Sequence, residues 1–225
     1  MIEDDDDAQS ANRAEATRKA LLMAGLNEFG SHGFTGTSTR RIAAAAKANI
    51  GSIAYHFGGK EGLRKACARF VVDTLRSIAG KAVGLNEAAP ASAQDAEDRL
   101  VHTVETVVHF LVAGRVAPQL VQFVLREISH PGPVLDILYG AAFEPIHKRL
   151  CQLWGQATGE PAESEETRIA VFTMIGQVVY LRIGREAVIR RMGWQSIGQD
   201  EAAKLAAVAS DNLRMVIRAR REAAT

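Results

Sequence analysis

The chain has 225 residues, of which 47% are apolar and 24% charged, and its formal net charge is +1. This composition is that of an ordinary globular protein with a sizeable core, organised as one large domain or as a small domain joined to a larger one. The amino terminus, MIEDDDD, is acidic where a secretory signal would be basic and then apolar.

Two further features favour a cytoplasmic protein without membrane contact. The longest apolar run, VVHFLVAG at 107–114, is far shorter than the roughly 20 residues of a membrane span. The two cysteines, Cys67 and Cys151, lie far apart and offer neither a disulfide framework nor a zinc-binding signature. We therefore expect a reducing, cytoplasmic setting.

The charge is unevenly distributed along the chain. Residues 1–10 carry five acids and no base, whereas residues 11–85 carry twelve Lys and Arg against four Asp and Glu. Residues 86–225 are close to neutral, with 15 bases and 17 acids. A basic first third indicates a segment that binds a polyanion such as DNA, although a solvated charged surface would give the same skew.

The abundance of alanine, the scarcity of proline and the lack of strand-like alternation predict an all-α fold. Apolar spacing predicts a first helix over residues 12–30. Ser38 is a candidate N-cap for a short helix over 38–48, and Asn49 for a third helix that runs to about Phe57.

The rest of the chain is also expected to be helical. A fourth helix is predicted over 60–83, and the small, polar, proline-bearing stretch 84–98 indicates a loop. Later helical patterns cover residues 97–114, 118–129, 133–154, 164–191 and 200–221.

Residues 38–57 have the pattern of a helix-turn-helix, in which two short helices are joined by about three residues. With about 100° per residue, one face of the second short helix carries core anchors: Ile53 and Phe57, with Ile50 nearby. Its outward side is small at the amino end and polar further on: Gly51, Ser52, Tyr55 and, at the flank, His56. Such a face suits entry into a DNA major groove.

Basic residues stand in first turns of helices, where the helix dipole favours acids by about 0.3–1 kcal/mol. Arg40 and Arg41 open the second helix, and Lys60 opens the fourth. Glu61 and solvent would offset any one of them, but all three around one short helix favour phosphate contacts. The run GGKEG is not a P-loop, because Glu61 follows Lys60 and no strand precedes it.

The run FTGTSTRRIAAAAKANIGSIAYHFGGKEGL (34–63) resembles the DNA-binding domain of the TetR family of bacterial transcriptional repressors. The resemblance implies phosphate contacts from Thr37, Thr39, Arg40, Tyr55, His56 and Lys60. It implies base-edge contacts from Asn49, Ile50, Gly51 and Ser52. Lys47 replaces the usual turn glycine, so the turn is tightened differently or Lys47 reaches the DNA backbone, and Ala54 replaces a tyrosine of many members.

Later stretches, REISHPGP (126–133) and GQVVYLRIGREAVIRRMGW (176–194), are similar to a TetR subgroup with a CecR-like carboxyl-terminal domain. The resemblance implies three parts: an acidic disordered tail (1–11), a three-helix helix-turn-helix DNA-binding domain (12–59), and a larger helical effector-binding and dimerisation domain (60–225). It implies a repressor, not an enzyme, that binds a palindromic double-stranded DNA operator as a homodimer, needs no cofactor and is released by a small-molecule effector.

Reading two half-sites requires a dimer. Two apolar stripes at helical spacing are candidates for a four-helix interface: Ile169, Phe172, Thr173, Gly176 and Val179, and Leu205, Val208, Leu213, Val216 and Ile217. By spacing alone, the alternative that these stripes face only their own core is at least as well supported.

The effector pocket is expected mainly within residues 97–154, where polar and aromatic side chains would orient a ligand in an apolar cavity. The candidates are His102, His109, Phe123, Arg126, Glu127, Tyr139, His147 and Tyr180. We expect no bound metal. Two trios of potential ligands each share a helical face, so a metal-responsive regulator remains an alternative. They are His102, Glu105 and His109, and Glu144, His147 and Cys151. An enzyme that uses His109 or His147 and a nucleoid-type binder without ligand control are more remote alternatives.

Overall fold

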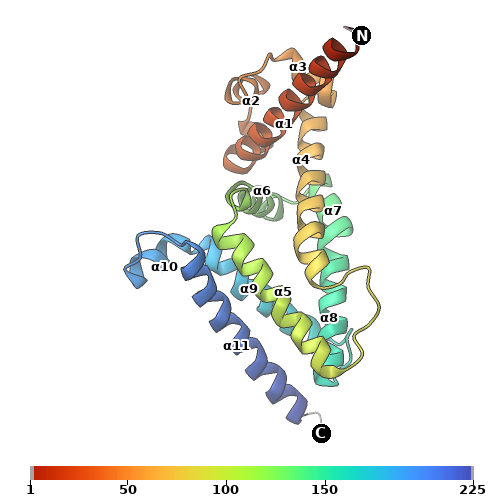
Figure 1. The fold of residues 1–225 in the computed structure, drawn as a ribbon, viewed down its shortest axis with the longest axis vertical. Helices are drawn as coiled ribbons and strands as arrows, with labels where there is room; N and C mark the ends of the chain where they lie inside the picture. Colours follow the sequence, from red (N-terminus) through yellow and green to blue (C-terminus); the bar gives the residue numbers. More distant parts are fainter. Residues whose placement is uncertain (1–2, 224–225) are drawn as a thin grey trace. The chain divides into compact units, whose positions relative to one another are not determined.

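The computed structural model describes residues 3–223, and side-chain burial from residue 12 onward. Within this range the chain is helical and contains no strand, so the all-α prediction is confirmed (Figure 1). The chain divides into two compact units. Unit 1 comprises Met1–Val72 and Gln119–Leu138, and unit 2 comprises Asp73–Pro118 and Tyr139–Thr225.

Unit 1 contains the helix-turn-helix and the helices that pack on it. Its helices are α1 (Glu3–Gly36), α2 (Thr39–Ala45), α3 (Gly51–Phe57), most of α4 (Lys60–Leu75), most of α6 (Ala117–Ser129) and α7 (Pro133–Leu138). Their shared core is fully buried: Leu21, Leu26, Phe29, Ile42, Ile53, Leu63 and Phe123. This compact unit is larger than the predicted segment 12–59, because it takes in α4 up to Val72 and the separate segment 119–138.

Helix α1 differs in two ways from the sequence prediction. It begins at Glu3, whereas residues 1–11 were expected to be a disordered tail. A run of acidic residues near a helix N-terminus is favoured by the helix dipole. Its other end extends to Gly36 across a break at Gly33, whose φ of 70° lies in the left-handed region that glycine adopts readily.

Helix α6 is fixed to unit 1 by close backbone packing and by a buried ion pair. A Cβ atom at Gly30 of α1 would lie 3.1 Å from the backbone nitrogen of Phe123, so the glycine permits the close approach of α1 and α6. Arg64 of α4 donates two hydrogen bonds to the carboxylate of Glu127, at 3.0 and 2.6 Å. The Glu127 side chain is 2% exposed, so this bidentate pair lies in the interior.

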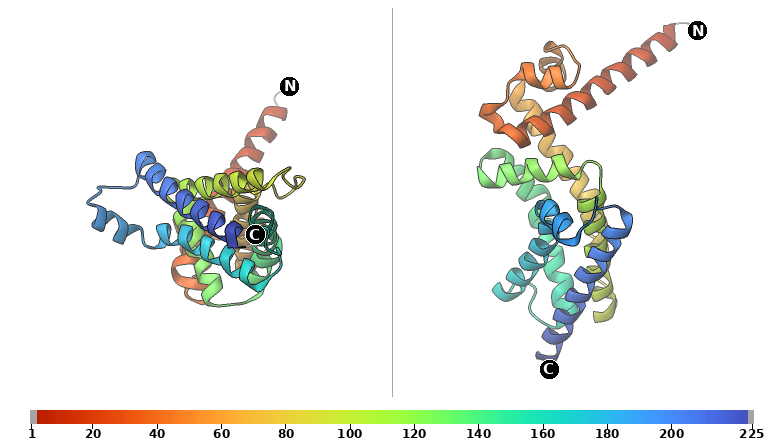
Figure 2. Two further views of the ribbon diagram at one scale, coloured as in Figure 1. Left: turned by 90° about the horizontal axis from the view of Figure 1, so that it is seen from below. Right: turned by 90° about the vertical axis from the view of Figure 1, so that its left-hand side faces the viewer.

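Unit 2 is a bundle built around α5 (Ala93–Ala113), which packs against α8, α9 and α11 (Figure 2). The other elements are the π-helical turns η1 (Arg76–Gly80) and η2 (Tyr139–Phe143), and α8 (Glu144–Thr158), α9 (Glu165–Ile183), α10 (Arg185–Met192) and α11 (Gln199–Ala223). The π-helical turn η2 separates α7 from α8, and Gly184 separates α9 from α10, where the sequence predicted single helices over 133–154 and 164–191.

The loop before α5 is held by a buried arginine of α8. Arg149, 9% exposed, donates to the carbonyl oxygens of Val83, Glu87 and Ala88. Ser92 then caps α5 by accepting from the backbone nitrogen of Asp95 at 3.1 Å. In the described part of the chain no single helix is long and apolar enough to cross a membrane, and α5 and α6 reach that criterion only when counted together across a sharp bend.

Replacing Glu127 by Ala should loosen α6 and α4 in unit 1. Removing one partner of a buried ion pair costs about 3–5 kcal/mol, and the 20% exposure of the Arg64 side chain places the expected loss at the lower end. Hydrogen exchange should therefore accelerate in peptides from 60–72 and 119–138. The matched variant Glu61→Ala, at an exposed position of α4, should leave both regions protected. Equal exchange in the two variants would contradict a stabilising role for the pair.

Candidate DNA-binding surface and effector pocket

Ser38 caps α2 as the sequence predicted, whereas the N-cap residue of α3 is Ile50 rather than the predicted Asn49. The Ser38 side chain accepts from the backbone nitrogen of Arg41 at 3.2 Å, and the Asn49 side chain accepts from that of Gly51 at 2.8 Å. Gly58 ends α3 in the left-handed conformation, with φ at 71°. Ile53 is buried, but Ile50 is 49% exposed and Phe57 only half-buried. The predicted core role of Ile50 is therefore wrong, because α3 begins after it and leaves its side chain in solvent.

Ten of the eleven predicted DNA contacts lie at least partly on the surface of unit 1. Five of them are on α3 or start α4 (Gly51, Ser52, Tyr55, His56 and Lys60), and five are on α2 or the turn (Thr39, Arg40, Lys47, Asn49 and Ile50). Tyr55 is the most exposed of the large hydrophobic side chains, at 82%, and its ring meets that of His56 edge to face. The structure therefore groups these ten residues around one short exposed helix.

Thr37 is the exception. Its side chain is 2% exposed, and its hydroxyl lies 2.9 Å from the carbonyl oxygen of Glu28 and 2.7 Å from that of Gly33. This buried hydroxyl ties the two sides of the α1 break together. The arrangement gives no support to a phosphate contact from the Thr37 side chain.

The three basic residues at helix starts differ in their surroundings. Arg41 already has an anionic partner within unit 1, because its Nε lies 3.0 Å from a carboxylate oxygen of Glu28. Arg40 is exposed and forms no ion pair with the residues that the structure describes. The Lys60 ammonium lies 4.3 Å from the centre of the Phe34 ring, a cation–π contact that holds it at the start of α4. Arg40 and Lys60 thus remain available for phosphate, whereas Arg41 serves the fold.

Lys47 occupies the turn between α2 and α3. Its φ of 52° makes it the only non-glycine residue with positive φ in the described chain. The resemblance places a glycine at this position, and the backbone here has the left-handed conformation that glycine adopts readily. A lysine there costs about 1–2 kcal/mol relative to glycine, so a favourable contact of its exposed ammonium would offset this strain.

Three effector candidates belong instead to the packing of α6 in unit 1. Phe123 is fully buried, and Glu127 is paired with Arg64. The Arg126 guanidinium fills the space beside Gly33, where a Cβ would lie 2.7 Å from one of its nitrogens. These contacts explain the three side chains without a ligand, so they give no support to an effector role.

The other five candidates lie in unit 2 and do not line one common cavity. Tyr139 and Tyr180 are 53% and 58% exposed. The half-buried His147 stacks on Phe172, with ring centres 4.0 Å apart, and its Nδ1 lies 3.6 Å from the sulfur of Cys151. Burial lowers the pKa of His147 and raises that of Cys151 to about 11, so both are neutral near pH 7. His109 is half-buried, and His102 is exposed and lines a pocket.

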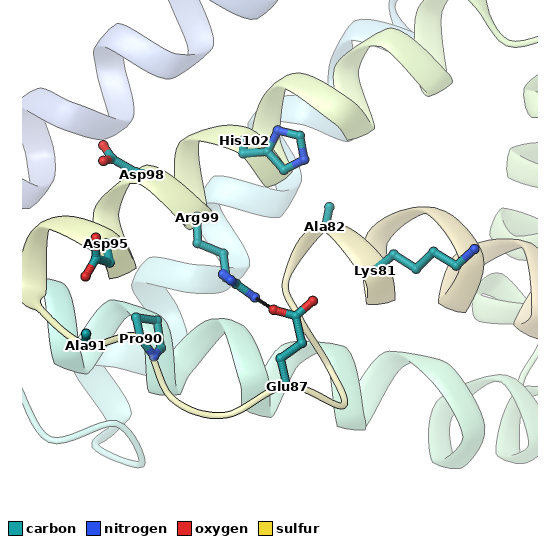
Figure 3. A pocket seen from close by; sticks show the side chains of 9 residues that line it. All are labelled: Lys81, Ala82, Glu87, Pro90, Ala91, Asp95, Asp98, Arg99 and His102. Carbon is teal, nitrogen blue, oxygen red and sulfur yellow. Dashed lines mark hydrogen bonds and ion pairs between the residues drawn. The ribbon is translucent and has the colours of Figure 1, made fainter.

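That pocket has a volume of about 560 Å³ and lies between residues 81–91, which follow η1, and the start of α5 (Figure 3). It is lined by Lys81, Ala82, Glu87, Pro90, Ala91, Asp95, Asp98, Arg99 and His102. Arg99 pairs with Glu87 across it, and Gly84, with φ at 63°, leaves room for the guanidinium. Its lining mixes apolar surface with side chains of both charges, whereas the sequence predicted a mainly apolar cavity.

No metal site is formed by the side chains that the structure describes. No group of three or more His, Cys, Asp or Glu residues is placed to hold an ion there. In the second trio, a protonated thiol at Cys151 is a poor ligand, because thiolate is the form that binds metal.

Comparison with known proteins agrees with this architecture. A family model for the amino-terminal domain of bacterial regulatory proteins of the TetR family matches residues 21–67. A model for the carboxyl-terminal domain of the HTH-type transcriptional dual regulator CecR matches residues 96–220, more than half of the chain. The chain belongs to the TetR family, in its CecR-type branch. It is a DNA-binding transcriptional regulator.

Individual relatives of this TetR-family regulator support the assignment. The HTH-type transcriptional dual regulator CecR of Shigella flexneri is 28% identical over 195 residues, which cover 84% of this chain and 86% of the relative. The regulator RaaS of Mycobacterium tuberculosis is 45% identical over 85 residues, or 37% of this chain and 40% of its own. The structure of AibR with isovaleryl coenzyme A and operator DNA has a TM-score of 0.64 at 16% identity, covering 86% of this chain and 96% of AibR, which shows a shared fold.

Replacing Lys47 by Gly should act on stability and on DNA binding in opposite directions. Unit 1 should gain about 1 kcal/mol of unfolding free energy as the left-handed strain is relieved. Affinity for DNA of any sequence should fall, and the salt dependence of binding should lose about one counterion. Lys47→Asn serves as the control, because asparagine also adopts the left-handed conformation readily. Its salt dependence of DNA binding should lose the same counterion. An unchanged salt slope in both variants would show that Lys47 does not reach the DNA.

Proposed function

We propose that this TetR-family regulator is a cytoplasmic homodimeric repressor that binds a palindromic operator and leaves it when a small molecule binds. The observation that supports operator binding is the exposed face of α3, with its small residues at the amino end and Tyr55 and His56 beyond them. Small residues admit the helix to the major groove, and the larger side chains contact phosphate or base edges.

Phosphate contacts are assigned to the basic and hydroxyl side chains around α3. Arg40, Lys47 and Lys60 surround its two ends, and Thr39 stands at the start of α2. Base-edge contacts are assigned to the segment Asn49–Ser52. Because the Asn49 carbonyl oxygen caps Gly51, only its amide NH₂ remains for DNA.

The homodimer is proposed on α9 and α11. The predicted stripe on α9 is largely exposed: Ile169, Phe172, Thr173 and Gly176 face solvent, and Val179 is half-buried. On α11, Val208 and Val216 are exposed, whereas Leu213 and Ile217 are buried in the core of unit 2. The α9 stripe thus supports an interface, and only part of the α11 stripe does.

The effector site is proposed at the polar pocket that contains His102 and Arg99. Because Arg99 is already paired with Glu87, Lys81 is the cation that favours an anionic group on the ligand, whereas Asp95 and Asp98 on the same rim favour polar or cationic groups beside it. AibR, which has this fold, is bound to an acyl-coenzyme A thioester. Acyl-coenzyme A compounds are therefore the first class to test. No catalytic role is assigned to any residue.

Operator binding is tested by selecting sites from random duplex DNA and measuring affinity against salt. We expect a palindromic site and log Kd that rises with log salt. Lys60→Gln should weaken binding to all sequences and lower the salt slope by about one, whereas Ser52→Ala should reduce the preference for the selected site. Salt-insensitive or absent binding would contradict the proposed function.

The effector site is tested by thermal shift with a panel of acyl-coenzyme A thioesters, hydrophobic drugs and divalent metals. A ligand at 100 times its Kd should raise the unfolding free energy by about 2.7 kcal/mol. His102→Ala and Arg99→Gln should reduce the shift, and His130→Ala, an exposed histidine outside the pocket, should not. A shift that persists in both pocket variants would place the effector elsewhere.

A further inference from the structure

A small charged cluster joins the end of α1 to the start of α2 within unit 1. One carboxylate oxygen of Glu28, Oε2, lies 3.0 Å from Nε of Arg41 and 3.3 Å from Nδ1 of His32. A terminal nitrogen of the Arg41 guanidinium lies 3.1 Å from Nε2 of the same histidine. One anion therefore lies against two basic side chains, and these two also lie against each other.

The shared oxygen of Glu28 is buried and incompletely satisfied. Glu28 is 9% exposed, and neither contact of its Oε2 is aligned as a hydrogen bond. Native proteins leave few buried polar atoms in this state, so each of them calls for an explanation. A buried carboxylate without a cation is costly. Glu28 therefore requires that at least one of its two basic neighbours carry a charge.

The two basic neighbours of Glu28 differ in how firmly they are placed. His32 stands one helical turn further along α1, so the helix itself keeps the ring near the carboxylate. Arg41 comes from α2, and its long side chain is 51% exposed. It follows Thr39 and Arg40, the two residues of α2 assigned to phosphate contacts. Arg41 is thus the neighbour that can exchange the carboxylate for a DNA phosphate.

The charge of His32 decides whether this exchange is permitted. Histidine is the side chain that ordinarily gains its proton between pH 5 and 8. A neutral His32 leaves Arg41 as the cation of the cluster, so the guanidinium must stay on Glu28. A protonated His32 supplies a second cation and repels the guanidinium beside it, so Arg41 is free to leave.

We propose that Arg41 is a further phosphate contact of the DNA-binding surface and that protonation of His32 makes it available. The inference rests on the proposed operator binding and adds a regulation to it. When His32 gains a proton, the imidazolium takes the place of the guanidinium as the cation of Glu28, and Arg41 turns to the phosphate backbone. DNA binding is then linked to the uptake of a proton, and by the same linkage the affinity rises as the pH falls.

The other charges around this end of α1 are basic. Arg126 of α6 lies beside the break in α1, and Lys60 and Arg64 of α4 lie over the phenyl ring that follows the break. Among the described residues, none of the three is at ion-pair distance from Glu28. Their positive charge opposes the protonation of His32, whereas the carboxylate favours it. None of them replaces the leaving guanidinium, so the exchange involves two cations only.

The salt dependence of DNA binding at two pH values tests this exchange. Each phosphate contact adds about one counterion to the slope of log Kd against log salt. For the selected palindromic duplex, the slope per bound chain should be steeper by about one at about pH 5.5 than at about pH 8. His56 of α3, which packs on α1, is the other histidine of the DNA-binding surface and is present in every chain compared.

A double-mutant cycle isolates the cluster from other sources of pH dependence. His32→Gln and Arg41→Gln should each remove the same single counterion from the difference between the two pH values. The double variant should lose no more than either single variant, because both residues act in one exchange. A difference that survives either substitution, or losses that add, would overturn the proposal.

Glu28→Gln tests the carboxylate through a gain of contact. Without the anion, Arg41 is released at any pH, so the slope at about pH 8 should rise to the value found at about pH 5.5. Glu15→Gln changes the net charge equally at an exposed position of α1 and should keep the pH difference. Circular dichroism checks folding, and the cycle of the two exposed side chains decides the question if Glu28→Gln fails to fold. A folded Glu28→Gln chain with the wild-type slope would overturn the proposal.

Calorimetry measures the proton directly. At about pH 6.5, the heat of DNA binding in buffers of different ionisation enthalpy should show an uptake of up to about one proton per chain at this cluster. His32→Gln should remove this uptake, and His130→Gln, at an exposed histidine outside the cluster, should retain it. Equal uptake in the two variants would contradict a role for His32.

The two proposals fail in different ways. DNA binding whose salt slope is the same at both pH values would retain the regulator and reject this exchange. Absence of DNA binding at either pH would reject the proposed operator binding itself.

Discussion

The ion pair between Arg64 and Glu127 determines how unit 1 is assembled. It joins α4 to α6, and its two residues are 63 positions apart in the sequence. The chain passes from one unit to the other within each of these two helices. The Arg64 guanidinium also lies 5.0 Å from the centre of the Phe34 ring, and the Lys60 ammonium contacts the same ring. One buried carboxylate therefore stabilises the packing of α6 against α4 within unit 1.

The helix-turn-helix could be predicted from the sequence because its signals are local. Ser38 caps α2 across three residues as expected, and Asn49 still accepts from the nearby backbone nitrogen of Gly51, although Ile50 is the N-cap of α3. The errors concern partners distant in sequence or space. The sequence shows that Arg41 stands at a helix start, but only the fold shows that Glu28, 13 residues earlier, lies beside it. Thr37 was assigned to phosphate by resemblance, whereas folding turns its hydroxyl inward.

The effector candidates show the same limit more strongly. Sequence identifies a polar side chain on an apolar helix, but it does not reveal whether that side chain already has a partner. Glu127 is neutralised by Arg64, and His147 is kept neutral by burial against Phe172 and Cys151. The pocket beside His102 depends on a loop that Arg149 holds by its carbonyl oxygens and on the pairing of Arg99 with Glu87, contacts that no periodic pattern encodes.

The two levels of symmetry in this protein make different demands on its residues. A palindromic operator requires two copies of α3 in a two-fold arrangement, and a two-fold axis requires a surface that is its own complement. In the proposed homodimer, the surface that joins the two copies therefore has a second role, because it also fixes the distance at which two copies of α3 meet the two half-sites.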